Sequence, residues 1–147
     1  MNDATGHDAV AFYLAYLHPL WMLATIGLAL MTLRAGLALR SARRRGQRRS
    51  GASYRRHLKL AKPTLLLLML GFAAGLASSV GLRGWSAFGS AHGIVASIAL
   101  CLFGTTGFLG HRLERGQSHS PDAHGILALL SILAALTAFG TGFVLLP

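Results

Sequence analysis

The chain has 147 residues, of which 53% are hydrophobic and 12% are charged, and its formal net charge is +10. This balance excludes an ordinary soluble globular domain and is typical of a small membrane protein with several spans. The positive charge alone would also suit a nucleic-acid-binding protein, but the basic residues flank long apolar runs and no nucleic-acid-binding module is recognisable. We therefore expect no nucleic-acid partner.

Four uncharged runs follow one another along the chain, and each reaches the roughly 20 residues that an α-helix needs to cross a bilayer. They are Ala9–Leu33, Pro63–Leu82, Gly84–His111 and Ala123–Pro147. The sequence predicts one all-α domain over residues 1–147, an integral membrane up-down four-helix bundle. Its spans are expected at about residues 10–39, 53–81, 88–110 and 121–146.

The basic segment at residues 40–62 holds ten of the fourteen Lys and Arg residues and separates the first two runs. Because a block of like charge is hard to move across a bilayer, we expect this basic loop to be cytoplasmic. The even number of spans then places both termini outside, and Arg83 becomes the only Lys or Arg on the outer side. Anionic lipid headgroups are the expected neighbours of most of the basic residues.

Two helix starts can be read from local residues. The second helix is expected to begin near Ser53, which places Pro63 within its early turns. The sequence Ser120-Pro121-Asp122 predicts the start of the fourth helix, with Ser as the cap, Pro at the first helical position and an acid in the first turn.

The seven histidines divide by depth. His7 and His119 are expected at the surface, and His111 at the inner end of the third helix, where a cation is favoured. The other four form two depth-matched pairs: His18 and His92 near the outer ends of the first and third helices, and His57 and His124 near the inner ends of the second and fourth. In an up-down bundle the members of each pair lie on diagonal helices and face each other across the axis.

Two facing imidazoles can clamp a flat macrocycle, and ionisable residues at membrane depth suggest a function. The sequence thus predicts two haem b groups per chain, with His18, His92, His57 and His124 as iron ligands. No C-x-x-C-H motif is present, so attachment would be non-covalent. Taken singly, each histidine is better interpreted as an interfacial residue at a helix end, and it is the matched depths of all four on diagonal helices that favour haem. Zinc is disfavoured because it normally needs further Cys or carboxylate ligands, and the spans offer only Cys101.

Basic and small residues complete the expected sites. Arg83 outside, and Arg34 and Arg56 inside, are candidates to pair with haem propionates, as are Arg55 and Lys59. Glycines at both levels would leave room for a macrocycle, although Gly71-x-x-x-Gly75 is also an ordinary helix-packing motif. These glycines are Gly71, Gly75, Gly140 and Gly142 at the outer level and Gly36, Gly104 and Gly107 at the inner level. Ala91-His92-Gly93 and Ala123-His124-Gly125 are similar, but the match is too short to establish an internal repeat.

A resemblance extends over most of Tyr16–Leu146. It rests on four short motifs in order: His18-Pro19, Arg56-His57, Gly89-Ser90-Ala91-His92 and Ala123-His124. These resemble an uncharacterised bacterial family of four-span membrane proteins, grouped with cytochrome b561-like di-haem proteins and found largely in photosynthetic bacteria. The resemblance implies a core bundle with two b haems, each ligated from alternate helices, in a bacterial inner or photosynthetic membrane. The extra flanking spans of eukaryotic cytochrome b561 proteins are lacking, so an ascorbate site is not implied.

The expected function is transmembrane electron transfer, since two protein ligands leave iron no open position. The electron donor and acceptor are left open among a quinone, a small reductant and a redox protein. A homodimer is also left open. Two alternatives remain: a haem-free accessory or assembly subunit of a larger membrane complex, and a small transporter that uses histidines as proton carriers.

Overall fold

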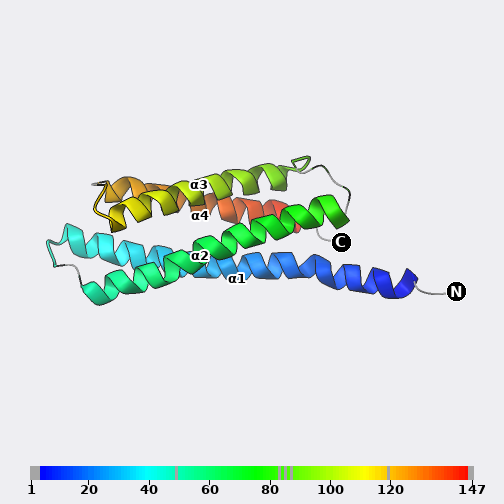
Figure 1. Ribbon diagram of the computed structural model, residues 1–147, viewed down its shortest axis with the longest axis horizontal. Helices are drawn as coiled ribbons and strands as arrows, with labels where there is room; N and C mark the ends of the chain where they lie inside the picture. The colour runs from blue at the N-terminus through cyan, green and yellow to red at the C-terminus, as the bar shows by residue number, and fades with distance from the viewer. Residues whose placement is uncertain are drawn as a thin grey trace.

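Four long helices form the protein, as the computed structural model shows in Figure 1. The structure describes residues 4–48, 50–82, 84, 86, 88–118 and 120–145, and describes side chains from residue 16 onward. The helices are α1 (Ala4–Arg44), α2 (Gly51–Ala77), α3 (Ala91–Glu114) and α4 (Pro121–Phe143), and α2 continues as the short π-helix η1 (Ser78–Leu82). The predicted all-α four-helix bundle is confirmed.

All four helices are long and apolar enough to cross a membrane. Large apolar side chains remain exposed along them, including Leu20, Leu66, Ile98 and Leu133, which are 52–61% exposed. Such side chains would be costly in water but are at home against lipid tails. Burial and composition together are those of a membrane bundle.

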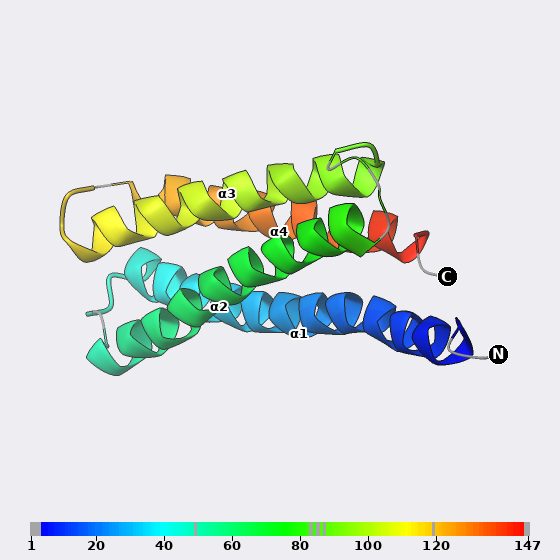
Figure 2. The same ribbon diagram turned by 45° about the vertical axis from the view of Figure 1, so that its right-hand side comes forward.

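Neighbouring helices run antiparallel and pack as two hairpins, α1 with α2 and α3 with α4 (Figure 2). Contacts within a hairpin are more extensive than those between hairpins, which join α1 to α4 and α2 to α3. In the described part of the chain, the backbones of α1 and α3 do not come into contact, and neither do those of α2 and α4. The odd helices are therefore diagonal, and so are the even helices.

The helix ends differ from the expected spans in several places. α1 is longer at both ends, and most of the basic segment is helical, since the described residues outside helices between α1 and α2 lie only within 45–50. Arg43 and Arg44 occupy the last turn of α1, where cations interact favourably with the helix dipole. α3 begins at Ala91 instead of Phe88 because Ser90 caps it, its Oγ accepting a hydrogen bond from the Gly93 N–H at 3.1 Å.

α4 begins at Pro121, as expected, but Ser120 does not act as foreseen. Its side chain makes no capping hydrogen bond to any described residue. The acid of the first turn, Asp122, instead lies 3.0 Å from Arg40 and 3.1 Å from Arg43, both on α1. The first turn of α4 is thus tied to the other hairpin.

The buried core is small and lies at mid-height, between the two histidine levels. Two pairs of hydroxyl side chains flank it, one in each hairpin: Thr32 with Thr64, and Thr106 with Ser131, each 3.1 Å apart. Interhelical hydrogen bonds of this type hold membrane helices together. The core itself is formed by Ile26, Ala29, Leu68, Phe103, Ile132 and Ala135.

The two hairpins repeat each other position by position. Adding 74 to a residue number on α1 gives its counterpart on α3, and adding 67 on α2 gives its counterpart on α4. The hydroxyl pair Thr32–Thr64 thereby maps onto Thr106–Ser131. Buried positions map onto buried positions as well: Thr25 onto Ala99, Ala29 onto Phe103, Leu68 onto Ala135 and Gly71 onto Ala138. The repeat unit is thus a whole hairpin, whereas the short similarity around His92 and His124 relates α3 to α4 within the second hairpin and is not part of this repeat.

Candidate di-haem site

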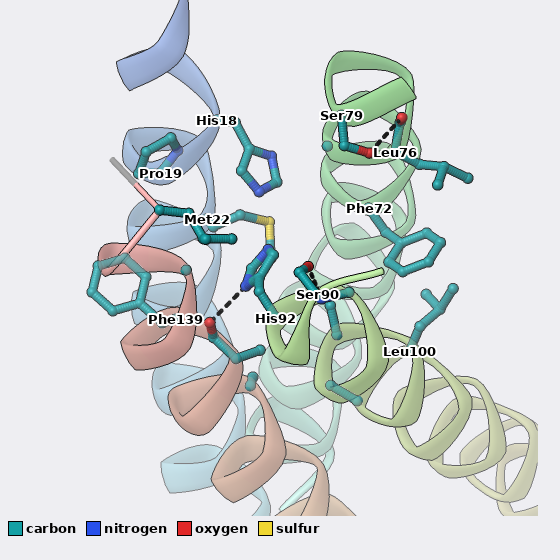
Figure 3. A pocket seen from close by; sticks show the side chains of 18 of the residues that line it. His18, Pro19, Met22, Phe72, Leu76, Ser79, Ser90, His92, Leu100 and Phe139 are labelled. Atoms are coloured by element: carbon teal, nitrogen blue, oxygen red, sulfur yellow. Dashed lines mark hydrogen bonds between the residues drawn. The ribbon is translucent and has the colours of Figure 1, made fainter. Parts of the chain in front are cut away.

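His18 on α1 and His92 on α3 point into the same pocket near the outer end of the bundle (Figure 3). Their ring centroids are 6.3 Å apart and their planes are nearly perpendicular, at 84°. The backbones of the two helices do not come into contact, so side chains bridge the diagonal. The sequence-predicted outer pair is brought together. We call it the outer pair.

His57 on α2 and His124 on α4 form the inner pair at the other end. Their centroids are also 6.3 Å apart, with an angle of 89° between ring planes. His57 lies in the second turn of α2, because that helix begins at Gly51, well before Pro63. His124 lies in the first turn of α4, which places both imidazoles at one level.

The spacing of 6.3 Å matches two imidazoles that bind one metal ion from opposite sides. A metal–nitrogen bond is about 2.0–2.1 Å long, and the nitrogen lies about 1.1 Å from the centre of its five-membered ring. Two ligands in line on opposite sides of the metal therefore place their centroids about 6.2–6.4 Å apart. Both pairs show that separation.

Three of the four histidines have their Nδ1 atom bound to a backbone carbonyl of the neighbouring helix. A carbonyl only accepts hydrogen bonds, so Nδ1 carries the proton and Nε2 keeps its lone pair. That arrangement is the usual one for a metal-ligating histidine, because it orients the ring and makes Nε2 a better donor. The bonds run from His57 to Thr32 at 3.2 Å, from His124 to Thr106 at 3.0 Å and from His92 to Ala138 at 2.8 Å.

His18 is the exception. Its Nδ1 is buried and makes no hydrogen bond, although the backbone of Gly71 is its electrostatic neighbour. Gly71 is the counterpart of Ala138, which binds His92. His18 therefore faces the backbone of Gly71 as His92 faces that of Ala138, but only His92 makes a hydrogen bond there.

A glycine of the partner helix in the same hairpin lies against each imidazole. A Cβ on Gly75 would come within 2.7 Å of His18, and one on Gly142 within 2.7 Å of His92. At the inner level the corresponding distances are 3.2 Å from Gly36 to His57 and 3.1 Å from Gly110 to His124. Any side chain would push against the ring, so the backbone is shaped to hold four imidazoles in ligating positions. On this observation the residues fit a bis-histidine haem at each level.

The other glycines singled out in the sequence have different neighbours. Gly71 faces Trp21 and Met22, and Gly107 faces Leu65, while Gly104 and Gly140 have no such neighbour within 4 Å. The glycines at the two sites thus receive imidazole rings directly.

A regular spacing in the sequence carried this signal and was missed. Every helix has its histidine and its cradling glycine 18 residues apart: His18 and Gly36, His57 and Gly75, His92 and Gly110, His124 and Gly142. Eighteen residues are five helical turns at about 3.6 residues per turn, so both members lie on one helix face. Each helix therefore supplies a ligand to one level and a cradle to the other.

Two cavities surround the pairs. The outer one has a volume of about 170 Å³ and the inner one about 380 Å³. The ring of His124 contacts α3 at Thr106 and Gly110, which lie 14 and 18 residues after His92. At about 1.5 Å per residue the two levels are about 21–27 Å apart.

Basic residues line the inner cavity, but not those expected. Arg34 and Arg56 are exposed and do not line it, whereas Arg40, Arg43 and Lys62 do. Lys62 pairs with Glu114 at 3.0 Å, so the second hairpin supplies the acids and the first hairpin the bases. Arg83, expected at the outer site, lies outside the described residues. The described polar residues of the outer cavity, apart from the two histidines, are Ser78, Ser79, Ser86 and Ser90.

The remaining histidines stand apart from the pairs. His111 is exposed at the inner end of α3, 3.9 Å from Glu114, and lines the inner cavity without belonging to a ring pair. The side chain of His7 and the whole of His119 lie outside the described parts. Among the described residues, no three His, Cys, Asp or Glu side chains gather into a metal site, so each pair offers a metal two protein donors. Comparison with known protein families, curated proteins and solved structures finds no match to this chain.

Proposed function

We propose that this protein carries electrons across a membrane through two non-covalently bound b haems, in the manner of cytochrome b561-like proteins. The observation that supports it most is the repetition of one ligand geometry at two depths. His18 with His92 and His57 with His124 have the same centroid separation of 6.3 Å on diagonal helices. This separation is the one expected for two imidazoles that bind one metal ion from opposite sides.

The chain's own residues hold the ligands in place. Carbonyls of neighbouring helices fix the tautomer at His57, His92 and His124, so Nε2 is ready to bind a metal before it arrives. The glycines leave room for the rings to lie against the neighbouring helix backbone. Preorganisation of this kind lowers the cost of changing oxidation state, because the ligands need not move.

Haem would supply a one-electron carrier whose iron is saturated by its two axial imidazoles, which favours electron passage over oxygen chemistry. Placing the two ligand pairs about 21–27 Å apart divides a path across the hydrocarbon core, about 30 Å thick, into shorter steps. The basic residues around the inner pair would receive the carboxylates of the group and keep that face cytoplasmic. The resemblance to a bacterial family supports a location in the inner or photosynthetic membrane, and the basic segment at residues 40–62 supports an orientation with both termini outside.

The proton-carrying transporter is less well supported by the arrangement of the residues. Between the two histidine levels lies an apolar core that includes Ile26, Leu68 and Phe103. Protons need titratable groups or water at short intervals, and the described polar side chains around this core are hydroxyls that bond to each other or to helix carbonyls, such as Thr64 to Thr32 and to Leu60. Electrons can cross such a packed apolar layer.

A visible absorption spectrum tests the proposal directly. The protein, purified in mild detergent from haem-replete cells, should show the sharp reduced-minus-oxidised bands of low-spin b haem. Acid–acetone extraction should recover about two haems per chain. A colourless preparation with no extractable haem would rule the proposal out and leave the accessory-subunit and transporter functions.

A further inference from the structure

The two cavities share a single described residue, Phe103 of α3. It lines the inward end of the outer cavity and the outward end of the inner cavity. Phe103 is 9% exposed and belongs to the central buried cluster. Phe103 is therefore the described residue of the partition between the outer and inner pairs that both cavities share.

Phe103 also differs strongly in size from its counterpart in the hairpin repeat. Its counterpart on α1 is Ala29, which is 3% exposed and belongs to the same buried cluster. Counterparts in a repeat related by a twofold axis face that axis from opposite sides. Two aromatic rings would overfill the centre, while two alanines would leave a void joining the cavities. One large and one small residue fill it.

We propose that Phe103 is the positioning residue through which electrons pass between the two sites, an inference that rests on the proposed function. In each transfer the reduced site loses one electron as the other gains it, and at Phe103 no bond forms or breaks and no proton moves. The ring acts by filling the gap with packed, polarisable atoms, since a void offers no such atoms. The same partition keeps the two haems in separate chambers.

Because positions 29 and 103 are counterparts in the hairpin repeat, the role of Phe103 can be tested by moving the ring from one position to the other. If an aromatic ring at the centre is what matters, it can be supplied from α1 instead of α3. The double variant Ala29→Phe/Phe103→Ala moves the ring to the equivalent position. It should recover what Phe103→Ala loses, whereas Ala29→Phe alone overfills the centre.

The rate at which electrons cross the membrane can be measured in proteoliposomes with ferricyanide trapped inside and dithionite added outside. Dithionite is oxidised to sulfite outside, and each electron that crosses converts one ferricyanide to ferrocyanide. Either orientation of the protein in the vesicle uses the same step. Phe103→Ala and Phe103→Leu should bind two haems and cross more slowly, and the double variant should regain most of the rate. Phe108→Leu is the matched control, because Phe108 lies on the same helix, is 60% exposed and lines neither cavity.

Phe103→Leu keeps a branched apolar side chain, so it retains the fold if Phe103→Ala does not. A second readout needs no haem. The midpoint temperature of thermal unfolding should fall in Phe103→Ala and in Ala29→Phe, and it should recover in the double variant. Wild-type crossing rates in Phe103→Leu with both haems bound would overturn the inference and leave the proposed function standing. A wild-type protein without haem would instead overturn the proposed function.

Discussion

The outer and inner pairs have the same ligand geometry in different surroundings. Centroid separations are identical and ring angles are 84° and 89°. The described lining of the outer cavity bears serines and no Lys, Arg, Asp or Glu, whereas the inner lining includes Arg40, Arg43, Lys62 and Glu114. The repeated hairpin accounts for the likeness. The difference arises because the inner helix ends border the basic segment at residues 40–62 and carry Glu114 and Asp122. Ligation and environment are thus set by separate parts of the sequence.

Removing one ligand should separate the two sites completely. His92→Ala should lose the outer haem and keep the inner one, and His124→Ala should do the reverse, because each pair consists of two imidazoles and the loss of one leaves a single ligand. His18→Ala and His57→Ala should behave like their partners. The haem content per chain should fall from about two to about one, measured by extraction and by the reduced-minus-oxidised spectrum.

His111→Ala is the matched control, since His111 also lines the inner cavity but belongs to no pair. It should keep both haems. If His111→Ala loses one haem while His57→Ala keeps two, the inner site is built from neighbouring helices and the likeness between the levels is broken.

Replacing the glycines that contact the imidazoles with alanine should weaken haem binding more at the outer level than at the inner level. A Cβ at Gly75 or Gly142 would lie at 2.7 Å from an imidazole, against 3.1–3.2 Å at Gly110 or Gly36. Gly142→Ala should therefore release the outer haem more readily than Gly110→Ala releases the inner one. Overpacking of this kind costs about 1–3 kcal/mol. Haem retention during a thermal ramp gives the ranking.

Gly140→Ala and Gly104→Ala are controls on the same two helices. Neither glycine has a neighbour within 4 Å of an added Cβ, apart from its own helix backbone. Both variants should match the wild type or be slightly more stable, because alanine is the better helix former. An effect at Gly140 equal to that at Gly142 would mean that helix flexibility, and not the imidazole contact, is being measured.

The smallest expected effect is electrostatic and limited to the inner level. Asp122→Asn removes the acid that pairs with Arg40 and Arg43. Stability should change by only about 0.2–1 kcal/mol, since these pairs are partly exposed. The inner midpoint potential should rise, because a lost negative charge favours the reduced and less positive iron.

The two levels can be titrated one at a time by placing Asp122→Asn in the His92→Ala and His124→Ala backgrounds. The midpoint potential of the inner haem should rise, and that of the outer haem should stay unchanged within the error of the titration. Equal shifts at both levels would show that the charge acts through the whole bundle, and the contrast in environment would then have no functional weight.

The bundle and the histidine pairing could be predicted because both depend on depth along the helix. Hydropathy marks where each span lies, and antiparallel order then fixes which histidines share a level. The lining of the inner cavity depends instead on helix rotation. Arg40 and Arg43 follow Gly36 at i+4 and i+7 and share its face, whereas Arg34 lies two residues before it on another face. Once Gly36 is known to face His57, the same helical spacing predicts that Arg40 and Arg43 also face the inner cavity.

Two features were beyond reach for physical reasons. Ser90 was not recognised as a cap because the apolar run gives no sign of where α3 begins within it. The central place of Phe103 depends on how the two hairpins meet across their interface, which a pattern along one helix does not contain. The 18-residue spacing of histidine and glycine, by contrast, is present in the printed sequence and needed only to be sought on all four helices.

Each hairpin contributes one of the two histidines of each pair, and this has a consequence for the assembly of the protein. α1 packs mainly on α2, and α3 mainly on α4, so the hairpins can form as they are inserted, while the interface between them is the weaker one. With haem bound as proposed, every iron becomes a staple between the first and second hairpins, one near each surface of the membrane. A chain that has not received its cofactors would lack both staples and could open along the seam. Cofactor loading would then serve as a quality checkpoint, since a bundle held shut is protected from the membrane proteases that remove an open one.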